Sequence, residues 1–338
     1  MKFDVNKTNM VKALAIIFML WHHLFGCATM FCEQYGTEAA FIDYAHIYQL
    51  GLLFKICVGI YVFLTAYGIT CSYNAKFANE HVIEKAKMER FCFNRYIALS
   101  FNFIFVYIIA FMTSFLREGD FRAVYGQDGW EHGIRYILFD MLGVANYFST
   151  PSLNETWWYM PLALFLVLII PMIIKLYKQF GCGLVVVGIF LFYFGTSKTG
   201  FIQYALCVIM GIWCAEEHIL ERLADFKISN SKIVSWIIKM LFWSGMFALL
   251  LYLRRETQLT YWIDAIVPIV CCEICVELSR LPMIEKIMAF VGTHSMNMFL
   301  IHTLIFEYYF TEFIYGFKNW FLILLMLLLT SLIGSIAI

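Results

Sequence analysis

The sequence predicts an all-α fold, a polytopic transmembrane helical bundle with about ten spans and with both termini in the cytoplasm. The first observation is composition: 62% of the 338 residues are apolar, 14% are charged, and the mean hydropathy is +0.76. Soluble domains are about half apolar and about a quarter charged, so a globule with a wetted surface is excluded. The second and third observations are long apolar stretches along the whole chain and an uneven distribution of basic residues between its loops.

The apolar stretches give the elements in order. A helix needs roughly 17 to 25 apolar residues to cross about 30 Å of hydrocarbon. The stretches near this length are residues 10–28, 49–72, 95–116, 156–175, 182–195, 200–216, 233–253, 259–278, 287–314 and 319–338. A further stretch at 131–148 contains His132, Arg135 and Asp140, which favours an interfacial or re-entrant helix. Residues 1–338 are therefore expected to form a single integral membrane domain.

Basic residues in the short loops predict the orientation, because cytoplasmic loops retain positive charge. With the N-terminus inside, the inner segments collect roughly 13 Lys and Arg residues and the outer loops roughly 6. The loop at 29–48 contains Glu33, Glu38 and Asp43 but neither Lys nor Arg, which is typical of an outer loop. Both termini are therefore expected in the cytoplasm.

The cysteines give little evidence of a metal or redox site. Most of the 11 lie within apolar stretches, where a buried Cys behaves as a small apolar residue. Cys272 and Cys275 form a CxxC inside a predicted span, without a second such pair. Cys27 and Cys32 are the candidates for pairing in an oxidising compartment. No metal is expected, and a formal net charge of +0 argues against nucleic acid as a partner.

Ionisable residues inside the apolar stretches are the strongest functional signal, since a charge at membrane depth costs at least about 2.5 to 3.5 kcal/mol. Lys12 and His23 are separated by 11 positions, which is about three helical turns plus 20°. They share one face, with Lys12 at the cytoplasmic end and His23 about 16 Å deeper. An imidazole accepts a proton near neutral pH, so His23 is a candidate general base.

The roles of the other polar residues in the spans are less clearly indicated by the sequence. His302 lies about a dozen residues into its helix and either lines the same cavity as His23 or bonds a neighbouring helix. Asp264, Glu273 and Glu277 share one span, where structural pairing with Arg254, Arg255 or Arg280 competes with a proton path.

Four segments together resemble acyltransferase family 3. The stretch from Lys12 to His23 is similar to the first helix of that family, in which an Arg is followed by ten residues and a His; here Lys12 replaces the Arg. Arg90 and Arg95 precede a span in a way similar to the family's basic entry, although Ala98 stands where the family has a second Arg.

The other two segments are aromatic and C-terminal. Residues 154–160, which include Glu155, Trp157 and Tyr159, are similar to the aromatic opening of a long helix in the family. Residues 292–302 are similar to its G-x-x-S-x-x-x-Y-L-x-H segment, which ends here at His302. The four pieces follow the family's order over residues 10–302.

The resemblance implies a membrane acyltransferase of the bacterial plasma membrane that moves an acyl group, most plainly acetyl, from cytoplasmic acetyl-CoA to a hydroxyl of an outer-face glycan or lipid-linked glycan. Lys12, Arg90 and Arg95 would then hold the donor's phosphates, which cannot enter hydrocarbon. His23 and His302 would form the catalytic pair. The candidate acceptor-binding residues are His22, Glu155, Trp157 and Tyr159.

Several alternatives stay open at this point. His23 acts either as a general base or as a nucleophile that forms an acyl-histidine. A polytopic transporter or flippase would use the intramembrane His and carboxylate residues for proton coupling, although inverted repeats and proline-broken helices are not evident. A polymerase-like glycan enzyme with a lipid-linked donor would need a larger outer loop than residues 117–155. Membrane lipids are expected partners, and a homodimer is left open.

Overall fold

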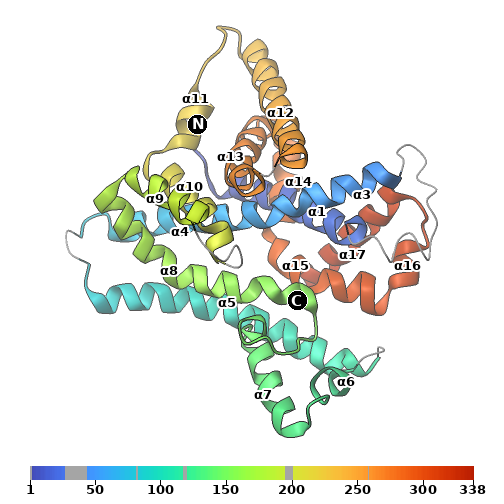
Figure 1. The fold of residues 1–338 in the computed structure, drawn as a ribbon. Helices are drawn as coiled ribbons and strands as arrows, with labels where there is room; N and C mark the ends of the chain where they lie inside the picture. Colours follow the sequence, from blue (N-terminus) through green and yellow to red (C-terminus); the bar gives the residue numbers. More distant parts are fainter. Residues whose placement is uncertain (1, 27–43, 81–82, 117–119, 195–200, 258) are drawn as a thin grey trace. The chain divides into compact units, whose positions relative to one another are not determined.

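The computed structural model describes residues 2–26, 44–80, 83–116, 120–194, 201–257 and 259–338. Within these ranges every regular element is helical, as the sequence predicts (Figure 1). Glu33, Glu38 and Asp43 of the predicted outer loop, and the candidate pair Cys27 and Cys32, lie outside the described residues. The chain divides into two compact units. The first contains Met1–His22, Leu52–His81 and Ile169–Ser295; the second contains His23–Gly51, Val82–Leu168 and Met296–Ile338.

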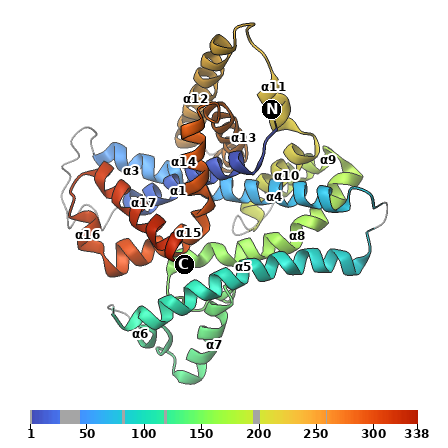
Figure 2. The same cartoon turned by 180° about the vertical axis from the view of Figure 1, so that it is seen from behind.

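The first unit is built around the crossing of two apolar helices. Its elements are most of α1 (Val5–Phe25), α4 (Cys57–Phe77), the end of α8 (Tyr159–Phe180), α9 (Gly183–Phe194), α10 (Phe201–Glu216), α11 (Ile219–Asp225), α12 (Lys232–Glu256), α13 (Thr260–Leu278) and α14 (Pro282–Thr293). Helix α10 packs along α4, and both contact α13 (Figures 1 and 2). Gly211 allows the close crossing, because a Cβ there would lie 2.6 Å from the carbonyl oxygen of Phe63.

Buried ion pairs join α12 to α13 in this unit. Arg254 Nε lies 2.7 Å from Asp264 Oδ1, and Lys239 Nζ lies 3.4 Å from Glu277 Oε1. Glu277 also pairs with Arg280 at 2.7 Å. The structure therefore shows the structural pairing for Asp264 and Glu277. Both carboxylate oxygens of Glu273 are buried and have no hydrogen-bond partner among the described residues.

The second unit contains both long and short helices. Its elements are α3 (Tyr44–Leu53), α5 (Lys85–Thr113), α6 (Phe121–Tyr125), α7 (Trp130–Met141), three 3₁₀ turns (Ser114–Leu116, Ala145–Phe148 and Glu155–Trp158), the start of α8, α15 (Ser295–Thr303), a π-helical segment (Leu304–Tyr309), α16 (Thr311–Tyr315) and α17 (Trp320–Ala337). Helices α6 and α7 pack together, and α7 also contacts α5. The π-helical segment follows His302 and Thr303 directly; such segments recur at functional sites.

In the part of the chain that the structure describes, six helical stretches are long and apolar enough to cross a membrane: Val5–Phe25, Ala45–Phe77, Lys85–Leu116, Glu155–Phe180, Lys232–Glu256 and Trp320–Ala337. The bent pair α14 and α15 with its π-helical extension raises the number to seven if it counts as one span. The predicted number of ten is not confirmed. Helices α9 and α10 have only 12 and 16 residues, and α13 contains three carboxylates, Asp264, Glu273 and Glu277.

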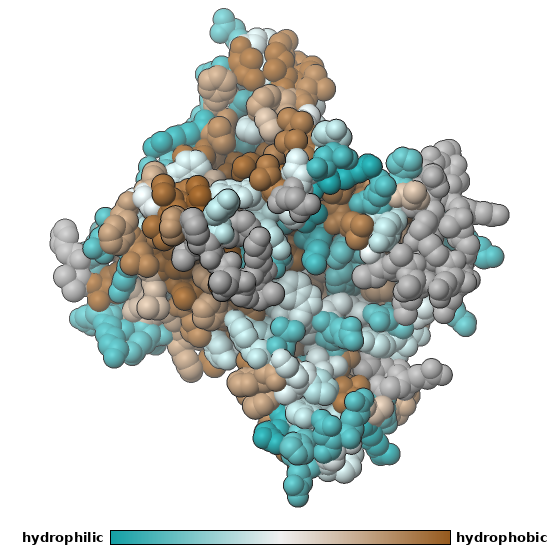
Figure 3. All heavy atoms as spheres, viewed as in Figure 1, coloured by the Kyte–Doolittle hydropathy of each residue, from teal (hydrophilic) through white to brown (hydrophobic). Residues whose placement is uncertain are grey.

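The surface of α12 is typical of a helix that faces lipid. Only 11% of the most apolar 18-residue stretch of α12 is buried in the protein, although the hydropathy of that stretch is high. Figure 3 shows apolar side chains gathered over this helix. The largest exposed ones are Ile233, Leu241, Phe242 and Tyr252. An apolar surface of this extent is stable in hydrocarbon and not in water, which supports an integral membrane protein.

Candidate functional site

Two histidines from opposite ends of the chain meet in the second unit. His23 lies in the last turn of α1, and His302 lies near the end of α15. His23 Nδ1 and His302 Nε2 are 2.6 Å apart, and the rings are tilted by 36°. His302 is fully buried. The structure thus brings together the two histidines that the sequence predicts as a catalytic pair.

The neighbours of His302 assign the protons of both rings. His302 Nδ1 is 2.6 Å from the carbonyl oxygen of Phe299, which accepts hydrogen bonds and cannot donate. Nδ1 of His302 therefore carries the proton, and Nε2 of the neutral ring accepts. His23 Nδ1 must then donate to His302 Nε2, so the lone pair of the His23 ring is on Nε2. This arrangement orients His23 as a base with a defined basic nitrogen.

A chain of hydroxyls continues from this pair. Thr303 Oγ1 lies 3.2 Å from His302 Nε2 and 2.9 Å from Thr156 Oγ1. The Thr156 hydroxyl donates to Asn154 Oδ1 at 2.7 Å, and the Thr156 backbone N–H donates to the same oxygen at 3.0 Å. Two donors fix the orientation of the Asn154 amide, so its Nδ2 points away from them. That nitrogen is buried and unpartnered among the described residues.

Trp157 forms the second contact between this segment and α15. Its indole Nε1 donates to the carbonyl oxygen of Leu300 at 3.0 Å, and its ring packs edge-on against Phe103 of α5. Tyr159, two residues later, packs edge-on against Phe299 with ring centroids 5.8 Å apart. The aromatic opening of α8 is therefore held against the helix that carries His302. Trp157 is 3% exposed, so its indole is mostly structural.

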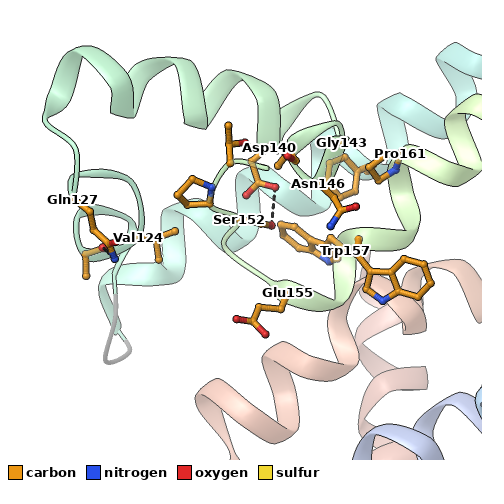
Figure 4. Close-up of a pocket in the computed structure, with 15 residues that line it drawn as sticks. Val124, Gln127, Asp140, Gly143, Asn146, Ser152, Glu155, Trp157 and Pro161 are labelled. Atoms are coloured by element: carbon orange, nitrogen blue, oxygen red, sulfur yellow. Dashed lines mark hydrogen bonds between the residues drawn. The ribbon is translucent and has the colours of Figure 1, made fainter. Parts of the chain in front are cut away.

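A cavity of about 730 Å³ lies on the other side of this segment (Figure 4). Its lining includes Asp140, Ser152, Glu155 and Trp157, together with Phe103, Gln127, Asn146, Thr150 and Trp158. Figure 4 shows the Asp140 carboxylate joined to the Ser152 hydroxyl, with the Trp157 indole beside them. Glu155 is exposed and is the first residue of the 3₁₀ turn Glu155–Trp158, which leads directly into α8. A pocket of this volume accommodates a small molecule or a few sugar units.

Asp140 is the centre of a hydrogen-bond network that shapes the cavity. Its Oδ2 accepts from the Tyr125 hydroxyl at 2.6 Å and from the Leu153 backbone N–H at 2.7 Å, and its Oδ1 accepts from Ser152 at 2.8 Å. Tyr125 in turn lies 3.0 Å from the Tyr107 hydroxyl of α5. Burial raises the pKa of the Asp140 carboxyl, and the three donated hydrogen bonds oppose that rise.

Replacing Asp140 should test whether this network holds the cavity together. Asp140→Ala leaves the Tyr125 hydroxyl without one partner and the Leu153 N–H unpaired in the interior, at a cost of about 2 kcal/mol. Asp140→Asn keeps an oxygen that can accept from both the Tyr125 hydroxyl and the Leu153 N–H, so it is expected to cost much less. Thermal unfolding of the purified protein in detergent measures both. Equal losses for the two variants would show that the hydrogen bonds are unimportant.

The predicted donor-binding cations lie on two different helices. Lys12 is in α1, within the first unit, where its Nζ is 3.5 Å from Asn9 Oδ1. Arg90 and Arg95 are on α5, within the second unit; Arg90 is exposed, and the Arg95 guanidinium lies 3.8 Å from the Phe91 ring centroid. His22 is half-buried and falls in the first unit.

Sequence reasoning missed the polar residues that connect the site. The sequence marks Asp140 only as a charge in an interfacial stretch, and it indicates no role for Asn154, Thr156 or Thr303. Their hydrogen bonds join positions up to 147 residues apart. The available signal is the cluster of polar residues at 152 and 154–156, shortly before an apolar helix.

Comparisons with known proteins identify the chain at the level of family. A family model described as an acyltransferase domain matches residues 6–338, which is nearly the whole sequence. Comparison with curated proteins and with solved structures found no match.

Proposed function

Because the chain belongs to acyltransferase family 3 and is a membrane acyltransferase, we propose that it transfers an acetyl group from acetyl-CoA to a hydroxyl of an outer-face glycan or lipid-linked glycan, in a bacterial plasma membrane. The observation that carries this proposal is the hydrogen bond between His23 and His302, together with the proton assignment that places the lone pair of His23 on Nε2. A base with a fixed basic nitrogen is what an acceptor hydroxyl needs in order to attack a thioester.

The reaction proceeds by base-assisted attack. Nε2 of His23 takes the hydroxyl proton as the oxygen forms a bond to the thioester carbonyl carbon. The tetrahedral intermediate then collapses, the carbon–sulfur bond breaks, and the coenzyme A thiolate leaves and receives the proton that Nε2 of His23 took up, which restores the neutral His23. During attack His23 becomes cationic, so its Nδ1–H bond to His302 becomes charge-assisted and stronger. His302 is a positioning residue, because the contacts described for it are with His23, Thr303 and Phe299.

The donor's phosphates require cations at the cytoplasmic level. Lys12 lies eleven positions before His23 on one continuous helix, so the helix itself separates the two groups by about 16 Å. An extended pantetheine arm is of that order of length, which allows the phosphates to stay at Lys12 while the thioester reaches His23. Arg90 and Arg95 are further candidates for phosphate contacts, because they lie in the basic N-terminal part of α5.

The function is tested by mass spectrometry of surface glycans from cells with and without the gene. We expect a mass of one acetyl group per modified unit to disappear with the gene and to return with the wild-type copy, but not with a His23→Ala copy. The purified protein in liposomes should release free coenzyme A from acetyl-CoA only when an acceptor glycan is present. Unchanged glycans and no release of coenzyme A would reject the proposal.

A further inference from the structure

The lining of the cavity at Asp140 has a definite chemical character. Trp158 supplies accessible aromatic surface beside the largely buried rings of Phe103 and Trp157, and Ser152, Asn146 and Gln127 supply hydroxyl and amide groups. Aromatic faces that pack on C–H groups, beside groups that exchange hydrogen bonds with hydroxyls, suit a polyhydroxylated ring better than a purely apolar ligand.

The described ionisable side chains that line the cavity are all acidic. Asp140 and Glu155 both line it, whereas no Lys, Arg or His among the described residues does so. Asp140 is 2% exposed and is held by three hydrogen bonds, so its position is fixed. Glu155 is exposed and carries its charge into the open part of the cavity. A carboxylate or phosphate on a ligand would meet like charge here without a described counter-ion.

The cavity and the histidine pair share one wall, within a single unit. Glu155 and Trp157 line the cavity, while Thr156 between them bonds to Thr303, the neighbour of His302. Trp157 is tied to Leu300, two residues before His302. Residues 155–157 therefore contact both the cavity and the helix that carries His302.

We propose that this cavity is the acceptor subsite and that it selects by charge: it takes uncharged or amino-bearing sugar units and rejects units that carry a carboxylate or a phosphate. The inference rests on the proposed acyl transfer to a glycan and adds the class of acceptor. It also excludes the anionic end of acetyl-CoA from the cavity, so donor and acceptor occupy chemically different places. Glu155 is the residue that sets the selection, because it is the exposed carboxylate of the lining.

The test uses three oligosaccharides with one backbone that differ in a single group: a neutral hexose, an amino sugar and a uronic acid. Transfer is measured as kcat/KM for each acceptor with the full-length protein in liposomes. We expect the uronic acid to be at least about tenfold poorer than the neutral sugar. Glu155→Gln should reduce the difference in kcat/KM between the neutral sugar and the uronic acid. Glu155→Lys should raise kcat/KM for the uronic acid to that for the neutral sugar or above it.

Glu131→Lys is the matched control. Glu131 is an exposed carboxylate on α7 that does not line the cavity, so the same charge reversal there should leave the ratio between acceptors unchanged. An equal shift for both variants would mean that the effect is general surface charge and would overturn the proposal. Wild-type kcat/KM values that are equal for the three sugars would overturn it too.

A binding measurement separates failure of this inference from failure of the proposed function. Saturation-transfer NMR reports contact of each oligosaccharide with the detergent-solubilised protein, without any donor. Transfer to all three sugars without discrimination rejects only the charge selection. Absence of transfer, with neutral and amino sugars bound in preference to the uronic acid, rejects the acyl transfer and keeps the subsite. Absence of both transfer and preferential binding rejects the two together.

Discussion

His23→Ala is expected to lower the rate of acetyl transfer by about 10²- to 10⁴-fold while the protein stays folded. The reason is that the proton assignment places the lone pair of the His23 ring on Nε2, whereas Nε2 of His302 accepts from His23. Release of coenzyme A by the protein in liposomes, measured with a thiol reagent under saturating donor and acceptor, gives the rate.

His302→Ala separates positioning from proton transfer. Because His302 acts through His23, this variant should lower kcat by a smaller factor and leave KM for acetyl-CoA unchanged. His132→Ala is the matched control, since His132 is an exposed histidine on α7 that pairs with Arg135. A His23→Ala protein that retains the wild-type rate would reject the general base, and a large change in KM with His302→Ala would reject its positioning role.

Gly292→Ala is expected to destabilise the protein by about 3 kcal/mol, at the upper end of the cost of overpacking. Gly292 lies in the last turn of α14, and a Cβ built on it would fall on the carbonyl oxygen of Asn9 in α1. The neighbouring atoms are backbone, which cannot turn away as a side chain can. Gly292 is the first residue of the segment 292–302 that resembles the family, and its close approach to the Asn9 backbone explains why a glycine is needed there. The midpoint of thermal unfolding in detergent measures the loss.

Gly245→Ala provides the comparison for that experiment. Gly245 lies within α12, and a Cβ there would meet no atom within 4 Å. Alanine favours a helix over glycine by about 0.8 to 1 kcal/mol, so this variant should be neutral or slightly more stable. If both variants unfolded at the same temperature, the close approach of α14 to α1 would not contribute to stability.

The location of the helices could be predicted from the sequence because each apolar stretch must satisfy its backbone hydrogen bonds internally. The number of spans could not, because α9 and α10 are short and α13 buries three carboxylates among apolar residues. Helical spacing relates residues on one helix, such as Lys12 and His23. It cannot relate His23 to His302, which are separated by 279 positions.

Helical periodicity could not predict the cavity, for a similar reason. Asp140 is connected to Ser152 and to the Leu153 backbone by bonds that depend on the path of the chain between α7 and α8. That path contains a left-handed residue, Ser149, with φ of 51°, which no propensity of Ser predicts. The family resemblance pointed to the aromatic opening of α8, but not to what faces it.

The two ion pairs between α12 and α13 have a consequence for how α12 sits in a bilayer. Lipid tails are as apolar as the helix surface, so hydrophobic burial gives little attraction between helices there. Arg254 with Asp264 and Lys239 with Glu277 attach α12 at two points that are about 22 Å apart along its axis. Two attachment points define both the depth of a helix and its rotation about its own axis. If the Arg254–Asp264 pair were removed, α12 would stay attached near Lys239, where Trp236 Nε1 also donates to the carbonyl oxygen of Glu277, but the depth and rotation of its other end would be less well defined.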